Sequence, residues 1–138
     1  MKKILIVAAH PDDEVLGCGG TIAKFSKKGL DIKVLFLSDG ESSRLTKVSI
    51  KKNLFRKKCS LKALKILGVK KFAFESFPDN KFDSVSLLEI IKKIQHHIKI
   101  FNPDTVLTHH FNDLNIDHQI TSKAVVTACR PRINNKVN

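Results

Sequence analysis

The sequence predicts an α/β fold with three layers, α/β/α, built around a mostly parallel sheet. Short apolar runs rich in β-branched residues alternate with segments whose apolar residues recur at helical spacing. Glycine, proline and polar turn residues separate these segments. Strands that alternate with helices in this way form βαβ crossovers, which cover a parallel sheet on both faces. The 138 residues suit a single domain over 1–138 with a real core.

The first half of the chain contains two predicted strands, each followed by a helix. The predicted elements are, in order, a strand over 4–9, a helix over 14–28, a strand over 32–37 and a helix over about 48–67. The first strand is apolar throughout, which is typical of a strand buried on both faces, and Pro11 follows it. Gly29 and Gly68 stand where the two helices should end.

The second half repeats the pattern with shorter strands. The predicted elements are a strand over 69–74, a helix that begins at Ser84 or Ser86 and continues to about 100, a strand over 104–108 and a helix over about 118–129. Asn102 and Pro103 end the first of these helices. A polar segment, "PDNKFDS", separates the third strand from its helix and reads as a loop.

The loops that follow the predicted strands hold most of the chemically active side chains. In parallel sheets, ligands bind at the carboxyl ends of the strands. The loops in question are His10–Glu14, Ser38–Arg44, Phe77–Asp83 and His109–His118. The fold is thus Rossmann-like, but the first loop is acidic and "GCGG" lies inside the helix, so the sequence disfavours a dinucleotide.

The charge of the chain is strongly positive, with 25 Lys and Arg against 13 Asp and Glu and a formal net charge of +12. The lysines are spread along the chain, arginine is scarce and phenylalanine is not interleaved with the lysines. A nucleic-acid-binding protein is therefore the least favoured hypothesis. Solvated lysine faces that attract anions in general account for the charge.

The cysteines and the N-terminus indicate the compartment. Cys18, Cys59 and Cys129 lie far apart, which disfavours a disulfide framework or a cysteine zinc site and fits a reducing cytoplasm. The apolar run after Lys2 and Lys3 is too short for a signal peptide. No stretch approaches the length that spans a membrane. We therefore expect a cytoplasmic protein without a membrane span.

Two acid–histidine loops predict a metal site. His10 and Asp13 stand three residues apart across a proline turn, so both can point into one crevice, and Asp12 between them is placed to act as a general base. The loop after the fourth strand offers Asp117 and His118 at the same edge of the sheet. Capping of the next helix is the simpler interpretation of a single such pair. Two matching loops favour the metal site.

The motifs "AHPDDE" and "DLNIDH" together resemble the LmbE-like, or PIG-L, family of metal-dependent N-deacetylases. The segments "DGESSR", "ALKILGV", "FPDNKFD" and "ACRP" also look like landmarks of that family, so the resemblance covers essentially the whole chain. These enzymes remove an acetyl group from an N-acetylated amino sugar, such as an N-acetylglucosamine conjugate. The resemblance implies a hydrolase whose small-molecule substrate is of this class.

The resemblance also implies roles for individual residues. His10, Asp13 and His118 become ligands of Zn²⁺, with another divalent metal such as Fe²⁺ also open, and Asp12 becomes the general base. Several family members carry a histidine where this chain has Asn115, which can donate a hydrogen bond to an oxyanion but cannot shuttle a proton. His109 or His110 could supply the proton instead.

The remaining candidates have two interpretations each. Asp117 orients a ligand histidine as an outer-shell partner or caps the helix that follows it. Three loop residues are predicted to bind substrate, namely Arg44, Asp39 and Asp79. The alternative for Arg44 and Asp39 is a salt pair on the surface. His96 and His97 fall on a lysine-rich helix and are predicted to be surface residues.

The length of the chain leaves a further alternative. Family members continue well past the "CRP" segment, whereas here "RINNKVN" follows it. We therefore expect the C-terminal part usual in the family to be missing. The alternative hypothesis is a truncated relative that binds metal but is weakly active or inactive. The sequence does not specify the N-acetylated substrate or the oligomeric state.

Overall fold

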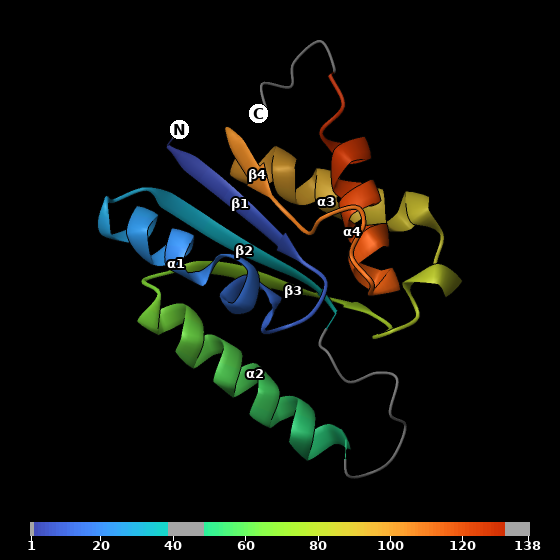
Figure 1. The fold of residues 1–138 in the computed structure, drawn as a ribbon, viewed down its shortest axis with the longest axis horizontal. Coiled ribbons are helices and arrows are strands. Elements are labelled where there is room, and N and C mark those ends of the chain that lie inside the picture. The colour runs from blue at the N-terminus through green and yellow to red at the C-terminus, as the bar shows by residue number, and fades with distance from the viewer. Residues whose placement is uncertain (1, 39–48, 132–138) are drawn as a thin grey trace.

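The computed structural model describes residues 2–38 and 49–131, and for 49–54 it describes the backbone only. Strands and helices alternate as predicted (Figure 1). In order, they are β1 (Lys3–Ala8), α1 (Asp13–Lys27), β2 (Asp31–Ser38), α2 (Ser49–Ile66), β3 (Lys71–Phe77), the 3-10 turn η1 (Phe82–Ser84), α3 (Leu87–Phe101), β4 (Thr105–Leu107) and α4 (Ile116–Ala128).

The four strands of the described chain form one parallel sheet in the order β3-β2-β1-β4. Ile4 of β1 pairs with Ile32 of β2 on one side and with Thr105 of β4 on the other. The chain thus moves outward from β1 to β3 and then returns to the opposite side of β1. The loops that follow β1 and β4 therefore lie side by side at the point where the strand order reverses.

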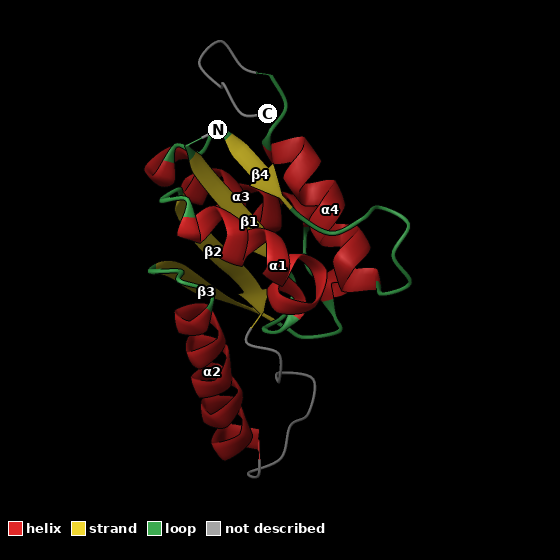
Figure 2. Cartoon of the chain, turned by 60° about the vertical axis from the view of Figure 1, so that its left-hand side comes forward, coloured by secondary structure: helices red, strands yellow, loops and turns green. Residues whose placement is uncertain are grey.

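The helices cover the sheet on both faces, which confirms the three-layer prediction (Figures 1 and 2). Ile4, Ile6 and Ala8 pack with α1 and α2, whereas Leu5 and Val7 pack with α3 and α4. Every residue from Ile4 to Ala9 is 3% exposed or less. A continuous apolar run was the expected signature of such a strand, because both of its faces lie in a core.

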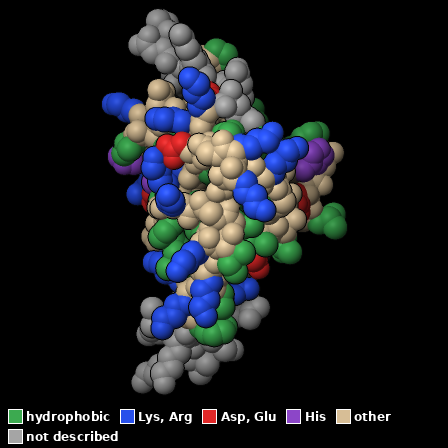
Figure 3. Space-filling view, turned by 90° about the vertical axis from the view of Figure 1, so that its left-hand side faces the viewer, with side chains coloured by type: hydrophobic (Ala, Val, Ile, Leu, Met, Phe, Trp, Pro, Cys, Tyr) green, Lys and Arg blue, Asp and Glu red, His purple; other side chains and the backbone are tan. Residues whose placement is uncertain are grey.

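One face of the molecule shows how its positive charge is distributed. On the face shown in Figure 3, Lys and Arg side chains are scattered over the surface, with few acidic groups between them. This is the distribution that the sequence predicted. No helix within residues 2–38 and 49–131 is long and apolar enough to cross a membrane.

Candidate metal centre

The candidate centre lies where the loops after β1 and β4 meet. His10 and Asp13 come from the first loop and the start of α1, and His118 comes from the first turn of α4. The reversal of strand order brings these residues together although more than a hundred positions separate His10 from His118. Their potential ligand atoms all lie within 4.8 Å of one another.

Asp13 stands between the two histidines. Its Oδ1 is 3.3 Å from Nε2 of His118, and its Oδ2 is 3.5 Å from Nδ1 of His10. The same Oδ2 accepts a hydrogen bond of 2.8 Å from the backbone N–H of His10, which fixes the carboxylate within the turn. One carboxylate therefore faces one nitrogen of each imidazole.

The other nitrogen of each histidine faces a different carboxylate. Nε2 of His10 is 2.9 Å from Oδ2 of Asp117 and 3.0 Å from Oδ1 of Asp79. Nδ1 of His118 is 3.1 Å from Oδ2 of Asp113. Histidines that bind metals almost always direct their second nitrogen to a carboxylate or carbonyl, which fixes the tautomer and the ring. Both histidines have this arrangement around Asp13.

Asp117 ties this cluster to the η1 segment. Its side chain is 1% exposed and, besides contacting His10, accepts hydrogen bonds from the backbone N–H groups of Asn80 at 2.7 Å and Phe82 at 3.0 Å. Of the two roles that the sequence left open, the structure places Asp117 against the imidazole. Outer-shell contacts of this kind hold a ligand in position.

Asn115 is the residue that caps α4. Its Oδ1 accepts hydrogen bonds from the backbone N–H groups of Asp117 at 2.8 Å and His118 at 3.4 Å. Asparagine is among the preferred residues at this position, so the helix-start pattern could have identified the role from sequence. The predicted donation to an oxyanion stays a prediction.

Of the three predicted substrate-binding residues, the structure describes only Asp79. Asp79 is 7% exposed and its carboxylate faces His10, so it belongs to the acid–histidine cluster rather than to an open loop surface. Asp39 and Arg44 lie outside the described residues. Sequence reasoning assigned no role to Asp113, although it is the first residue of the "DLNIDH" motif.

Asp12 occupies an unusual backbone position at the start of α1. Its φ is 123°, in a region that side-chain-bearing residues rarely adopt. Its N–H donates to Oε2 of Glu14 at 3.0 Å, and its carbonyl accepts from the first turn of the helix. Burial, and then the charge of Asp13, raise the pKa of Asp12 above its usual value. Backbone strain of this kind is concentrated at functional sites.

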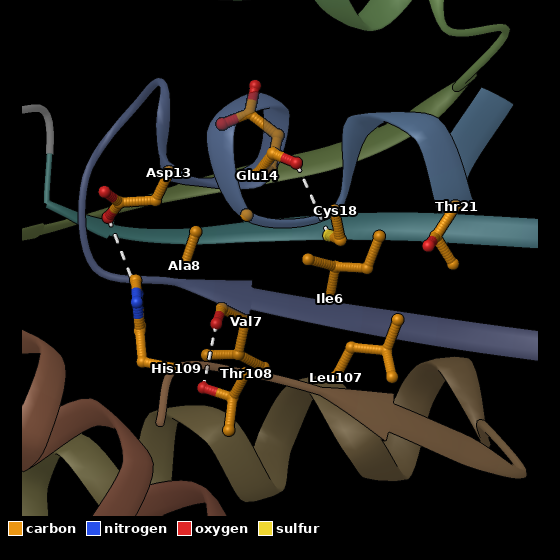
Figure 4. Close-up of a pocket in the computed structure, with 11 residues that line it drawn as sticks. Ile6, Val7, Ala8, Asp13, Glu14, Cys18, Thr21, Leu107, Thr108 and His109 are labelled. Carbon is orange, nitrogen blue, oxygen red and sulfur yellow. Dashed lines mark hydrogen bonds and ion pairs between the residues drawn. The ribbon is translucent and has the colours of Figure 1, made fainter. Parts of the chain in front are cut away.

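Two cavities flank this turn. One, of about 310 Å³, lies between α1 and strands β1 and β4, with Asp13 and His109 at one end and Cys18 and Thr21 at the other (Figure 4). The other, of about 360 Å³, lies between α1 and α2 and is lined by Asp12 and Arg56 among others. Asp12 therefore borders a space that could hold part of a ligand.

The charge around His10 is unbalanced. Burial alone would lower its pKa, but hydrogen bonds with Asp117 and Asp13, together with the charges of Asp13 and Asp79, outweigh burial and raise the pKa to about 9. Three carboxylates thus surround the imidazole of His10, and without a metal this imidazole is protonated near pH 7. A divalent cation would offset the same negative charge.

His109 is the neighbouring histidine that the sequence offered as a proton donor. Its ring stacks on that of His118 at 4.0 Å between centroids, and its Nε2 accepts the N–H of Ala9 at 2.9 Å. Burial and the charge of His118 lower its pKa to about 4, so the ring is neutral near pH 7. His110, by contrast, is exposed.

The residues present fit a metal such as zinc. Nε2 of His118 is buried and has no hydrogen-bond partner among the described residues. Imidazole and carboxylate are ligands that Zn²⁺ uses at catalytic sites. Two other triads within ligand distance, His109–Asp113–His118 and His10–Asp79–Asp117, share members with the predicted one. They mark a single continuous cluster.

Known proteins resemble the chain over nearly its whole length. The profile of the family described as PIG-L, GlcNAc-PI de-N-acetylase, matches residues 5–129. The uncharacterized deacetylase YaiS of Escherichia coli K12 is 34% identical over 136 residues, covering 94% of this chain and 69% of YaiS.

Two solved structures share the fold. The N,N'-diacetylchitobiose deacetylase of Pyrococcus horikoshii superposes with a TM-score of 0.82 at 25% identity, covering 93% of this chain and 49% of that one. GalB of Pseudomonas putida, a 4-carboxy-2-hydroxymuconate hydratase, has a TM-score of 0.79 at 26% identity, covering 93% of this chain and 55% of that one. The chain therefore spans about half the length of these structures. Because one fold serves a deacetylase and a hydratase, the site has to carry the functional argument.

Proposed function

Since the chain belongs to the PIG-L family, we propose that it is a zinc-dependent hydrolase that removes the acetyl group from an N-acetylated amino sugar or sugar conjugate. The observation that carries this proposal is the placement of Asp13 between His10 and His118, each of which turns its second nitrogen to another carboxylate. The arrangement supplies three ligands and a shell that orients them.

The positions of the residues support the following roles. His10, Asp13 and His118 would hold Zn²⁺, which when bound would supply a Lewis acid for the amide carbonyl and would make a nearby water more acidic. Asp12, beside this set, accepts a proton from the attacking water at its carboxylate. It then returns the proton to the amine nitrogen as the C–N bond breaks. Asp117 and Asp113 keep the two imidazoles in orientation.

The substrate class is drawn from the relatives and from the space beside Asp12. The family name and the Pyrococcus deacetylase both refer to N-acetylated glucosamine compounds. The cavity of about 360 Å³ between α1 and α2 has Arg56 on its wall, and hydroxyl or anionic groups of a sugar conjugate could bind there. The free cysteines at 18, 59 and 129 fit the reducing cytoplasm as the compartment.

Metal content and acetate release, measured on the same purified samples, test the proposal. The panel comprises wild type, Asp12→Asn, His118→Ala and, as a matched control, Asp83→Asn, which removes an exposed acid of η1. Chitobiose and glucoside derivatives of N-acetylglucosamine serve as substrates. We expect Asp12→Asn to bind metal normally and to lose about 10²–10⁴-fold in rate. His118→Ala should lose both metal and activity, and the control should lose neither.

Other outcomes separate the alternatives. Stoichiometric metal binding that depends on His118, without acetate release from any substrate, would favour a metal-binding relative that lacks turnover. Acetate release that is unchanged in Asp12→Asn would contradict the role of the base. A wild-type protein that binds no divalent metal would overturn the centre itself.

A further inference from the structure

A second cluster of ionisable groups, built around the buried His97, lies on the α3 face of the sheet, away from the strand ends. This Lys33 cluster consists of Lys33 of β2, Glu75 of β3, and Lys93 and His97 of α3. His97 is 9% exposed, although its lysine-rich helix predicted a surface position. That prediction was wrong for His97 and correct for His96. The inward face of α3 continues past its apolar residues to this imidazole, which reaches across to the edge strand.

The cluster forms a chain of hydrogen bonds. Nε2 of His97 is 2.9 Å from Oε1 of Glu75, and Nδ1 of His97 is 3.1 Å from Nζ of Lys33. The second oxygen of Glu75 is 3.0 Å from Nζ of Lys93. Lys33, His97 and Glu75 are therefore linked by two successive hydrogen bonds, with the imidazole of His97 in the middle.

The protonation of His97 follows from its partners. Burial lowers its pKa, and this effect exceeds the attraction of Glu75, so the ring is neutral near pH 7. A carboxylate only accepts hydrogen bonds, so Nε2 carries the hydrogen and donates it to Glu75. Nδ1 then has a free lone pair and accepts from Lys33.

Lys71 provides a contrast within the same patch. It pairs with Lys33 in the register of β2 and β3, and its Nζ lies 5.5 Å from the centre of the Phe101 ring, against 5.9 Å for Lys33. Nζ of Lys71, however, is 2.6 Å from a carboxylate oxygen of Asp31. The carboxylate stabilises the ammonium of Lys71, whereas a neutral imidazole lets Lys33 give up its proton.

The surroundings of Lys33 add to this difference. Burial, and then the charge of Lys71, lower the pKa of Lys33 below its usual value. Lys3 also approaches the Phe101 ring, with its Nζ 5.6 Å from the centre. The ammonium of Lys71 therefore disfavours a charge on Lys33, and the ammonium groups of Lys71 and Lys3 would attract a phosphate-bearing reagent.

We propose that Lys33 is a site of acylation by acyl phosphates, with His97 as the proton acceptor and Glu75 as the group that orients it. Nζ of Lys33 forms a bond to the carbonyl carbon, and the bond from that carbon to the phosphate oxygen breaks. One proton of the Lys33 ammonium passes to Nδ1 of His97 before the attack, which gives Nζ its lone pair. The phosphate leaves with the electron pair of the broken bond, and it takes up the second proton that Nζ loses as the amide forms. Glu75 stabilises the imidazolium until it releases the proton to water. The product is an uncharged Nε-acyl-lysine.

Limited acetylation of the intact protein tests this site. Wild type is exposed to a low concentration of acetyl phosphate near neutral pH, and mass spectrometry of its peptides measures the acetylated fraction at each lysine. We expect several-fold higher acetylation at Lys33 than at Lys71, although the side chain of Lys71 is 54% exposed and the more accessible of the two. Equal or greater acetylation at Lys71 would overturn the proposal.

Two variants test whether His97 and Glu75 cause the higher acetylation at Lys33. Glu75→Gln and His97→Gln should lower acetylation at Lys33 several-fold towards the level at Lys71, while Lys71 itself serves as the internal control and stays unchanged. Lys33 acetylation that does not respond to either variant, in proteins with cooperative unfolding, would exclude the relay. If either variant fails to fold, the ratio of Lys33 to Lys71 in wild type still decides the matter.

Discussion

His10 and His97 are two buried histidines with opposite surroundings. They are 8% and 9% exposed, and each has a ring nitrogen 2.9 Å from a carboxylate oxygen. Three carboxylates surround His10, and its pKa is raised to about 9. His97 has one carboxylate and one lysine against its ring, and its pKa is lowered. Burial and one hydrogen bond therefore do not decide the behaviour of a histidine in this protein.

The balance of charges in each cluster decides whether the pKa of its histidine is raised or lowered. Around His97, Lys33 and Lys93 accompany Glu75, so the cluster contains its own cations and joins α3 to the edge strand. Around His10, Asp13, Asp79 and Asp117 leave an excess of negative charge at the reversal of strand order. An uncompensated buried charge is costly unless a counter-ion offsets it. This excess of negative charge is the feature from which we expect the His10 cluster, and not the His97 cluster, to bind a cation.

The largest expected effect comes from removing the central carboxylate. Asp13→Asn keeps the size of the side chain but loses the charge between His10 and His118. We expect calorimetric titration with Zn²⁺ to detect no binding at concentrations that saturate wild type. Glu75→Gln is the matched control in the other cluster and should bind Zn²⁺ as wild type does. If Zn²⁺ binding were weakened equally in Asp13→Asn and Glu75→Gln, the assignment of the metal to the His10 cluster would be wrong.

A smaller effect is expected from the outer shell of the candidate centre. Asp117→Asn should weaken Zn²⁺ binding by about 10–100-fold without changing the stoichiometry, because the residue orients His10 rather than binding the ion. Asp113→Asn should weaken binding less, because the Asp113 side chain is 35% exposed whereas that of Asp117 is 1% exposed. Thermal unfolding of each variant controls for the lost hydrogen bonds of Asp117 to the η1 segment. A larger loss for Asp113→Asn would reverse this assignment.

The fold was predictable where burial leaves a clear pattern in the sequence. Strands β1 and β2 lie inside the sheet and read as apolar runs, so their positions were predicted within a residue or two. Strand β3 is an edge strand with mostly half-exposed side chains, and it begins at Lys71 and ends at Phe77 rather than covering 69–74. Val69 is buried before the strand starts, which explains why the apolar run misled the prediction.

The candidate centre was predictable to the extent that its residues are local. His10, Asp12 and Asp13 share one turn, and Asp117 and His118 share another, so the ends of two strands were enough to pair them. The contacts of Asp79 with His10, and of Glu75 and Lys33 with His97, join positions from separate elements. No spacing in one sequence encodes such contacts, because they arise only when the helices pack on the sheet.

The smallest expected effect is a pH dependence of stability that belongs to the His97 cluster. The folded-state pKa of His97 lies below its ordinary 6.5, and that of Glu75 lies below its ordinary 4.5 because hydrogen bonds from His97 and Lys93 outweigh burial. For both groups the unfolded chain binds protons more readily, so their contribution is present at higher pH and is lost as the pH falls. Chemical denaturation of metal-free wild type and His97→Gln, from slightly alkaline to acidic pH, should show a difference on the order of 1 kcal/mol that shrinks below pH 6.5. A difference that grows in acid would mean that His97 is held protonated, and the contrast with His10 would then disappear.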